Sequence, residues 1–106
     1  MPSRKEIADF LKKFKQCAQN KFQFVFRKKN LDAITSLGIT IIVAKEIILG
    51  LTPDNYCQGP DQDRDKPHSN LWVFETDFDG KKLYIKLSDN FSYDIAKCIS
   101  FHQKEF

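Results

Sequence analysis

The residues of this chain that could perform chemistry lie in two short stretches near its C-terminal end. Tyr84 and Lys86 alternate with apolar residues in one stretch, and Ser100 and His102 lie two residues apart in the other. Side chains two residues apart on a β-strand point to the same face of a sheet. If the two strands pair, a hydroxyl, an ammonium and an imidazole share one face. An imidazole exchanges protons near neutral pH, and an ammonium stabilises negative charge.

The first of these stretches belongs to a predicted β-hairpin. Asp79-Gly80 suits a two-residue type I′ turn, which needs positive φ at both residues. This turn sets Glu75 opposite Tyr84 and Val73 opposite Lys86. The predicted register leaves Val73, Glu75, Tyr84 and Lys86 on one face. The apolar residues of the hairpin then form the core face, which carries Trp72, Phe74, Leu83, Ile85 and Leu87.

A third strand is predicted over residues 93–102, because apolar and other residues alternate there. We expect Ile95, Ile99 and Phe101 to face the core. The opposite face would carry Ala96, Cys98, Ser100 and His102.

The first half of the chain predicts helices and one further strand. Ser3 and Glu6 form a capping box for an amphipathic helix over residues 4–19, whose outer lysines we interpret as solvated. Residues 22–26, with Phe at every second position, predict an edge strand. The cations that follow it, Arg27, Lys28 and Lys29, are the better candidate for an anion-binding surface.

Two shorter helices and a long loop are expected next. Asn30 is predicted to cap a helix over residues 31–37 that ends at Gly38, and Thr40 to cap a largely buried helix reaching about residue 49. Thr52 should cap a single turn. Residues 57–70 lack any periodicity and predict a loop.

Composition predicts one soluble, globular domain covering residues 1–106, with 42% apolar and 29% charged residues and a net charge of +3. The longest apolar run is far shorter than the ~20 residues of a membrane span, and the N-terminus lacks an apolar signal core, so we expect a cytoplasmic protein. The spacing of the three cysteines favours neither disulfides nor zinc, and a metal site from Cys57, His68 and Cys98 is a remote alternative. Asp61, Asp63 and Asp65 do not match a calcium loop.

The chain resembles the MqsR toxins of bacterial type II toxin–antitoxin systems over about three quarters of its length. The resemblance rests on the order and spacing of several pieces: Ile-Ile-Leu-Gly-Leu at 47–51 with Thr52, Asp54 and Tyr56, then His68 ahead of Trp72, Leu-Tyr-Ile-Lys-Leu at 83–87, and Ile-Ser-Phe-His at 99–102. The chain departs from the family pattern at Cys57, Val73 and His102.

The resemblance implies an α+β, RelE-like fold in which N-terminal helices pack on a small antiparallel sheet. It implies a metal-independent endoribonuclease, without a cofactor, that acts on mRNA either free or on the ribosome and is neutralised by an antitoxin protein. No membrane and no direct DNA binding are expected. Of the family's site residues, Tyr84 is kept. Tyr56 lies in the matching segment and is expected to contact RNA.

Metal-free RNA cleavage needs a general base, a cation and a general acid. Our hypothesis assigns proton transfer to His102 with His68 as a second group, phosphate stabilisation to Lys86, and phosphate orientation or base stacking to Tyr84. RNA-binding charge would come from Arg27, Lys28, Lys29 and Lys104. The alternative is a non-enzymatic protein-binding module, a degenerate toxin that only binds its antitoxin.

Overall fold

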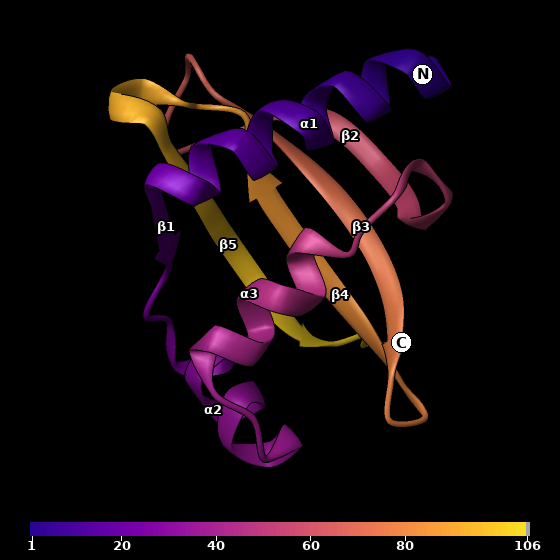
Figure 1. The fold of residues 1–106 in the computed structure, drawn as a ribbon, viewed down its shortest axis with the longest axis vertical. Helices are drawn as coiled ribbons and strands as arrows, with labels where there is room; N and C mark the ends of the chain where they lie inside the picture. The colour runs from indigo at the N-terminus through magenta and orange to yellow at the C-terminus, as the bar shows by residue number, and fades with distance from the viewer. Residues whose placement is uncertain (106) are drawn as a thin grey trace.

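A five-stranded mixed β-sheet with helices on one face forms the centre of the fold, as seen in the computed structural model, which describes residues 1–105 (Figure 1). The strand order is β1-β5-β4-β3-β2. The elements are α1 (Arg4–Asn20), β1 (Lys21–Phe24), α2 (Lys28–Leu37), α3 (Ile41–Leu49), β2 (Tyr56–Gln62), β3 (Asn70–Phe78), β4 (Lys81–Ser88) and β5 (Ile95–Gln103), with single 3₁₀ turns η1 (Pro53–Asn55) and η2 (Ser92–Asp94).

The helix α1 confirms the sequence prediction in its start, its cap and its buried face. Ser3 accepts from the backbone N–H of Glu6, and the Glu6 side chain accepts from the backbone of Ser3. Phe10 stacks on Trp72 with ring centroids 4.5 Å apart, which joins α1 to the sheet. The buried face consists of Ile7, Phe10, Leu11, Phe14, Cys17 and Ala18.

The β3–β4 hairpin also has the predicted turn and register. Asp79 and Gly80 have φ of 52° and 75°, the positive values that a type I′ turn requires. Glu75 pairs with Tyr84 and Val73 with Lys86. The predicted core face is buried as a whole, comprising Trp72, Phe74, Leu83, Ile85 and Leu87.

The expectation of a wholly antiparallel sheet is wrong, because β1 pairs with β5 in parallel. The two strands are separated by most of the chain, so no tight turn forces them to run in opposite directions. β1 does lie at the sheet edge as expected, but Phe26 lies beyond its end and is 73% exposed.

The short helices and the loop differ from the sequence prediction in detail. α2 begins at Lys28, with Arg27 at the cap position, so Asn30 is a buried residue inside the helix rather than its cap. In α3 only Ala44 and Ile48 are buried, so this helix is less buried than expected. Gly38, Thr40 and Thr52 end or cap their elements as predicted.

Residues 57–62 of the predicted loop belong to the edge strand β2, and Asn70 already begins β3. β2 pairs with β3, and its ladder has register shifts between Tyr56 and Gln58 and between Gln58 and Asp61. These irregularities remove the alternation by which a strand is recognised in a sequence. The loop itself covers residues 63–69.

The predicted faces of the third strand are correct only for its last part. Lys86 pairs with Ser100, but the next residue of β4, Leu87, pairs with Cys98, so Ile99 is an extra residue that forms a β-bulge. In the part of β5 before the bulge, each side chain points to the face opposite to the one predicted for it. Ala96 and Cys98 are therefore buried in the core, whereas Ile95 and Ile99 are only partly buried.

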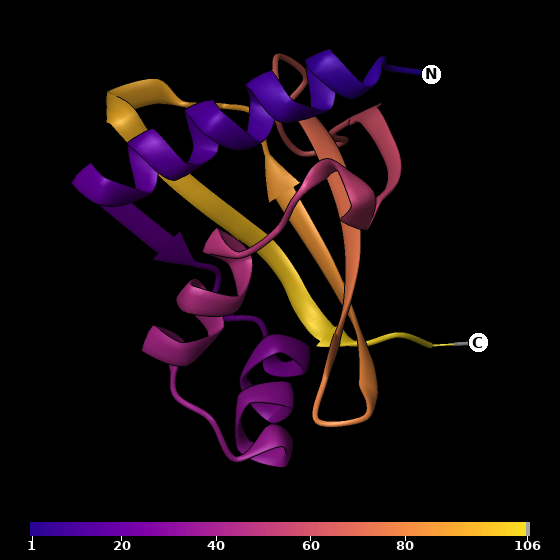
Figure 2. The same cartoon turned by 45° about the vertical axis from the view of Figure 1, so that its right-hand side comes forward.

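The helices leave one face of the sheet uncovered by helical layers. Figures 1 and 2 show α1 and α3 on the same side of the sheet, with α2 beside the end of β5. The other side of the sheet therefore has no helical layer over it.

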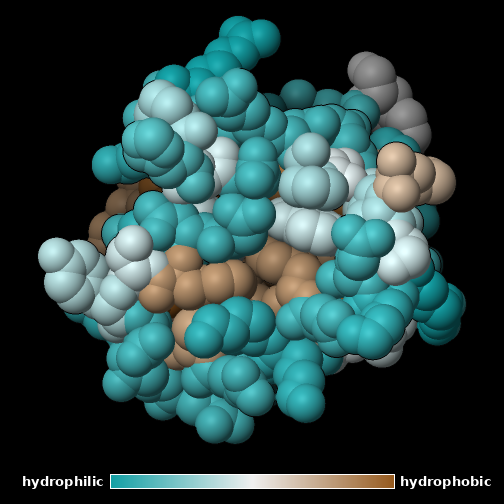
Figure 3. Space-filling model, turned by 90° about the horizontal axis from the view of Figure 1, so that it is seen from above, coloured by the Kyte–Doolittle hydropathy of each residue, from teal (hydrophilic) through white to brown (hydrophobic). Residues whose placement is uncertain are grey.

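Seen from above, hydrophobic residues reach the surface in a hollow framed by hydrophilic residues (Figure 3). No helix among residues 1–105 is long and apolar enough to cross a membrane.

Candidate functional site

Two rows of side chains cross the face of the sheet opposite α1 and α3, which we call the open face. One row consists of Glu75, Tyr84 and His102, which pair directly across β3, β4 and β5. The next row consists of Val73, Lys86 and Ser100. The structure thus brings Tyr84, Lys86, Ser100 and His102 together, as the strand pattern predicts.

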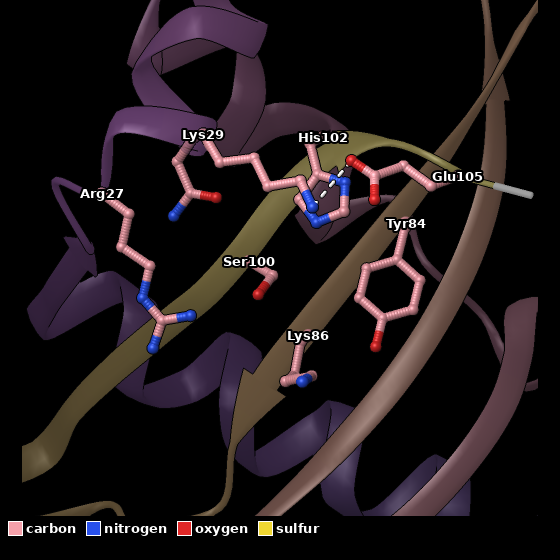
Figure 4. Close-up of a pocket in the computed structure, with 8 residues that line it drawn as sticks. Arg27, Lys29, Tyr84, Lys86, Ser100, His102 and Glu105 are labelled. Atoms are coloured by element: carbon pink, nitrogen blue, oxygen red, sulfur yellow. Dashed lines mark ion pairs between the residues drawn. The ribbon is translucent and has the colours of Figure 1, made fainter.

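A cavity of about 350 Å³ lies over these rows (Figure 4). Its floor comes from β4 and β5, and its wall comes from the start of α2 and the segment after β5. The lining residues are Arg27, Lys29, Asn30, Tyr84, Lys86, Ser100, His102 and Glu105.

His102 is held in one orientation by a stacked ring and a backbone contact. Its imidazole stacks on Tyr84 with ring centroids 5.2 Å apart and an interplanar angle of 18°. Its Nδ1 lies 2.9 Å from the carbonyl oxygen of Gln103. A carbonyl oxygen only accepts, so Nδ1 carries the proton in this contact. In the neutral ring, Nε2 then has the free lone pair of a general base.

Two cations of the cavity have no ion pair within residues 1–105, namely Arg27 and Lys86. The Lys86 ammonium lies 5.8 Å from the Tyr84 ring centroid, over the ring. In Figure 4 the Arg27 side chain extends from the start of α2 toward Ser100 and Lys86. These two groups are free to pair with an incoming anion.

The third cation, Lys29, is already paired. Its Nζ lies 2.7 Å from Oε1 of Glu105, the ion pair marked in Figure 4. The hydrogen bond from Lys29, reinforced by its charge, lowers the pKa of Glu105 below the usual range of a glutamate. Glu105 therefore keeps its negative charge at the rim of the cavity at neutral pH, where it opposes a second anion.

Asn30 is buried at 1% exposure where the cavity wall meets the β-bulge. Its Nδ2 donates to the carbonyl oxygens of Val25, at 3.0 Å, and Ile99, at 2.9 Å. Its Oδ1 accepts from the backbone N–H of Phe101 at 3.0 Å. One side-chain amide thus connects the segment after β1, α2 and β5.

Lys104 lies on the open face but outside the cavity lining. Its Nζ is 3.0 Å from Glu75 Oε2, which also accepts from the Cys57 thiol at 3.3 Å. The hydrogen bond from Lys104 lowers the pKa of Glu75. Burial, and then the bond to Glu75, raise the pKa of Cys57. This cluster leaves Lys104 less available to an anion than Arg27 or Lys86.

The remaining predicted site residues do not line the cavity. His68 is exposed in the loop over residues 63–69. Lys28 points its charge at Asp32, 2.7 Å away within α2. Tyr56 packs edge-to-face against the core residue Phe74 and donates to the carbonyl oxygen of Gly59.

A second cavity, of about 340 Å³, adjoins the first below the loop over residues 63–69 and shares Arg27 and Lys86 with it. Its apolar lining is formed by Leu71, Val73 and Ile99. Val73 is buried although it faces away from the helical layer. The open face thus carries two neighbouring cavities, one at His102 and one at the loop, that share Arg27 and Lys86.

Sequence reasoning missed Asn30 and Glu105 as parts of the site. Asn30 follows three cations and precedes an apolar periodic stretch, a pattern typical of a helix cap. Glu105 is a single charge near the chain end, and nothing local indicates that it reaches Lys29. Among residues 1–105, no three His, Cys, Asp or Glu side chains are grouped so that they could hold a metal ion.

Comparison of the chain with models of protein families, with curated proteins and with solved structures gave no match. What describes the class of this protein is its fold and its cavity: an α+β domain with a mixed sheet, whose open face carries a cavity lined by cations and a histidine.

Proposed function

We propose that this protein is an endoribonuclease that cleaves mRNA without a metal ion, with a RelE-like arrangement, and serves as the toxin of a type II toxin–antitoxin pair. The observation that carries the proposal is the cavity itself. It contains an oriented imidazole, His102, together with two cations that form no ion pair within residues 1–105, Lys86 and Arg27. The resemblance of the sequence to MqsR toxins supports the same surface.

The proposed reaction begins with the ribose 2′-hydroxyl. His102 Nε2 takes its proton while the 2′-oxygen forms a bond to the adjacent phosphorus. Lys86 and Arg27 stabilise the negative charge that develops on the phosphate oxygens. The bond from phosphorus to the 5′-oxygen breaks, and this oxygen leaves with a proton. The products are a 2′,3′-cyclic phosphate and a 5′-hydroxyl end.

The proton for the leaving oxygen comes from a group in the cavity. The hydroxyl of Tyr84, whose ring is stacked on His102, is the proposed donor. His68, the second proton-transfer group in the sequence hypothesis, lies outside the cavity lining and receives no step.

The test is cleavage of a mixed-sequence RNA in EDTA by the wild type and His102→Ala, with end-group analysis of the fragments and circular dichroism to verify folding. Tyr84→Phe is paired with Tyr93→Phe, because Tyr93 is exposed and lies away from the cavity. We expect the two cavity variants to lose cleavage and Tyr93→Phe to retain it. A folded His102→Ala variant that cleaves at the wild-type rate would refute the assignment.

The second candidate is a non-enzymatic module that only binds a partner protein. It is favoured by the β1 edge of the sheet, where a cavity of about 430 Å³ is lined mostly by apolar side chains, from residues 21–26 and Ile41. Phe26 and Ile42 are 73% and 70% exposed. Expression in bacteria without a partner separates the candidates, because an active toxin arrests growth and a binding module does not.

A further inference from the structure

The β-bulge in β5 determines which side chains the cavity receives. Lys86 pairs with Ser100 and Leu87 with Cys98, so one extra residue, Ile99, lies between them on β5. Because side chains alternate along a strand, one extra residue exchanges the faces of everything beyond it. With the bulge, Phe101 is buried in the core and Ser100 and His102 line the cavity.

Buried backbone groups without a strand partner require partners elsewhere. β1 pairs with β5 only as far as Cys98, so beyond Cys98 β5 has no strand partner on that side. The partner there is Asn30, whose carboxamide accepts from Phe101 N–H and donates to the carbonyl of the bulge residue Ile99. Its second amide hydrogen is directed to the carbonyl of Val25. Donors and acceptor of the carboxamide are therefore all used, at a position with 1% exposure.

We propose that Asn30 is the positioning residue of this site. Its carboxamide fixes the bulge and so directs His102 toward Tyr84, and through the same helix it fixes where Arg27 and Lys29 stand relative to β5. The effect on cleavage rests on the proposed function, whereas the effect on geometry does not. A geometric readout therefore tests the positioning role even if the protein cleaves no RNA.

The experiment uses NMR spectra of the full chain as wild type, Asn30→Ala and Asn30→Asp. The isosteric Asp keeps the acceptor for Phe101 N–H but sets a carboxylate against two carbonyl oxygens. The matched control is Asn55→Ala, since Asn55 also donates to a sheet carbonyl, that of Glu75 at 3.0 Å, away from the bulge. The readouts are cross-relaxation between the Tyr84 and His102 rings and hydrogen exchange of the Phe101 amide.

We expect both Asn30 variants to lose the cross-relaxation between the Tyr84 and His102 rings, and the Phe101 amide to exchange at least tenfold faster in Asn30→Ala. Asn55→Ala should keep both signals. If the wild type cleaves RNA, Asn30→Asp should lower kcat more than it raises KM, because the imidazole is displaced while Lys86 remains. If the wild type cleaves no RNA, this result contradicts the proposed function, and the NMR readouts still test the positioning role of Asn30.

A folded Asn30→Ala protein with wild-type ring contacts and Phe101 exchange would overturn the proposal. If neither Asn30 variant folds, hydrogen exchange of the Asn30 side-chain amide in the wild type tests the proposal. Both amide hydrogens of Asn30 must then be protected from exchange with solvent, as two occupied hydrogen bonds require. Rapid exchange of either hydrogen in the folded protein would overturn the positioning role without any variant.

Discussion

Replacing Glu105 by Gln should increase the affinity of the cavity for single-stranded nucleic acid and make binding more sensitive to salt. Glu105 holds the Lys29 ammonium at 2.7 Å and keeps its own charge at neutral pH, because Lys29 lowers its pKa. The amide of Gln cannot form that ion pair. Lys29 then joins Arg27 and Lys86 as a cation that a phosphate can contact.

The magnitude follows from counterion release. Each phosphate neutralised on a single strand changes the slope of log K against log salt by about −0.7. Glu105→Gln should therefore steepen the slope by about 0.7, and Lys86→Ala should flatten it by about the same amount. Between 50 and 200 mM salt, one such contact corresponds to an additional change in affinity of about 2.6-fold.

The assay is fluorescence anisotropy of a labelled 2′-O-methyl RNA, which cannot be cleaved by attack of a 2′-hydroxyl. The control is Glu46→Gln, which makes the same change in net charge. Glu46 is an exposed residue of α3 and does not line the cavity. We expect the slope of Glu46→Gln to match that of the wild type. Identical slopes for wild type, Glu105→Gln and Lys86→Ala would show that the cavity does not bind phosphates.

Three further predictions concern stability and reactivity. Phe10→Ala removes the ring stacked on Trp72 and should cost about 3–5 kcal/mol in urea unfolding, a large part of the ~5–15 kcal/mol of a domain; a loss below about 1 kcal/mol would contradict the packing described. Cys57, the exposed cysteine, should be alkylated more slowly than a free thiol at pH 8, because burial and then the bond to Glu75 raise its pKa, and Glu75→Gln should speed the reaction by removing the second cause. Lys104 lowers the pKa of Glu75, so this pair stabilises the fold fully above the ordinary pKa of a glutamate, and the stabilisation is lost as the pH falls through the lowered value. The free energy of unfolding of Glu75→Gln should therefore depend less on pH in that acidic range than that of the wild type.

Features set by neighbouring residues could be predicted from the sequence. The capping box of α1 lies within four residues, and the turn at Asp79-Gly80 fixes its hairpin because both residues have positive φ. From that turn the pairs of β3 and β4 follow by counting. The row that places Glu75 beside Tyr84 was therefore predictable, and so was the buried face behind it.

Features that depend on distant segments could not be predicted in this way. The parallel pairing of β1 with β5 joins the two ends of the chain. The ion pair of Lys29 with Glu105 forms only because α2 lies beside the end of β5. β2 was missed because its ladder is irregular, so its sequence shows no alternation.

The case of β5 shows how a correct site residue can come from a wrong strand pattern. A strict alternation that starts with Ile95 on the core face sets Ser100 and His102 on the open face. It sets Ala96 and Cys98 there too, but both are buried in the core. The bulge at Ile99 separates these two pairs. The sequence does not mark it, because Asn30, whose side chain donates to the Ile99 carbonyl, is about 70 residues away on another element. The positioning role proposed for Asn30 follows from this arrangement, because Asn30 lines the cavity and its carboxamide also bonds the backbone of Ile99 and Phe101, the residues on either side of Ser100.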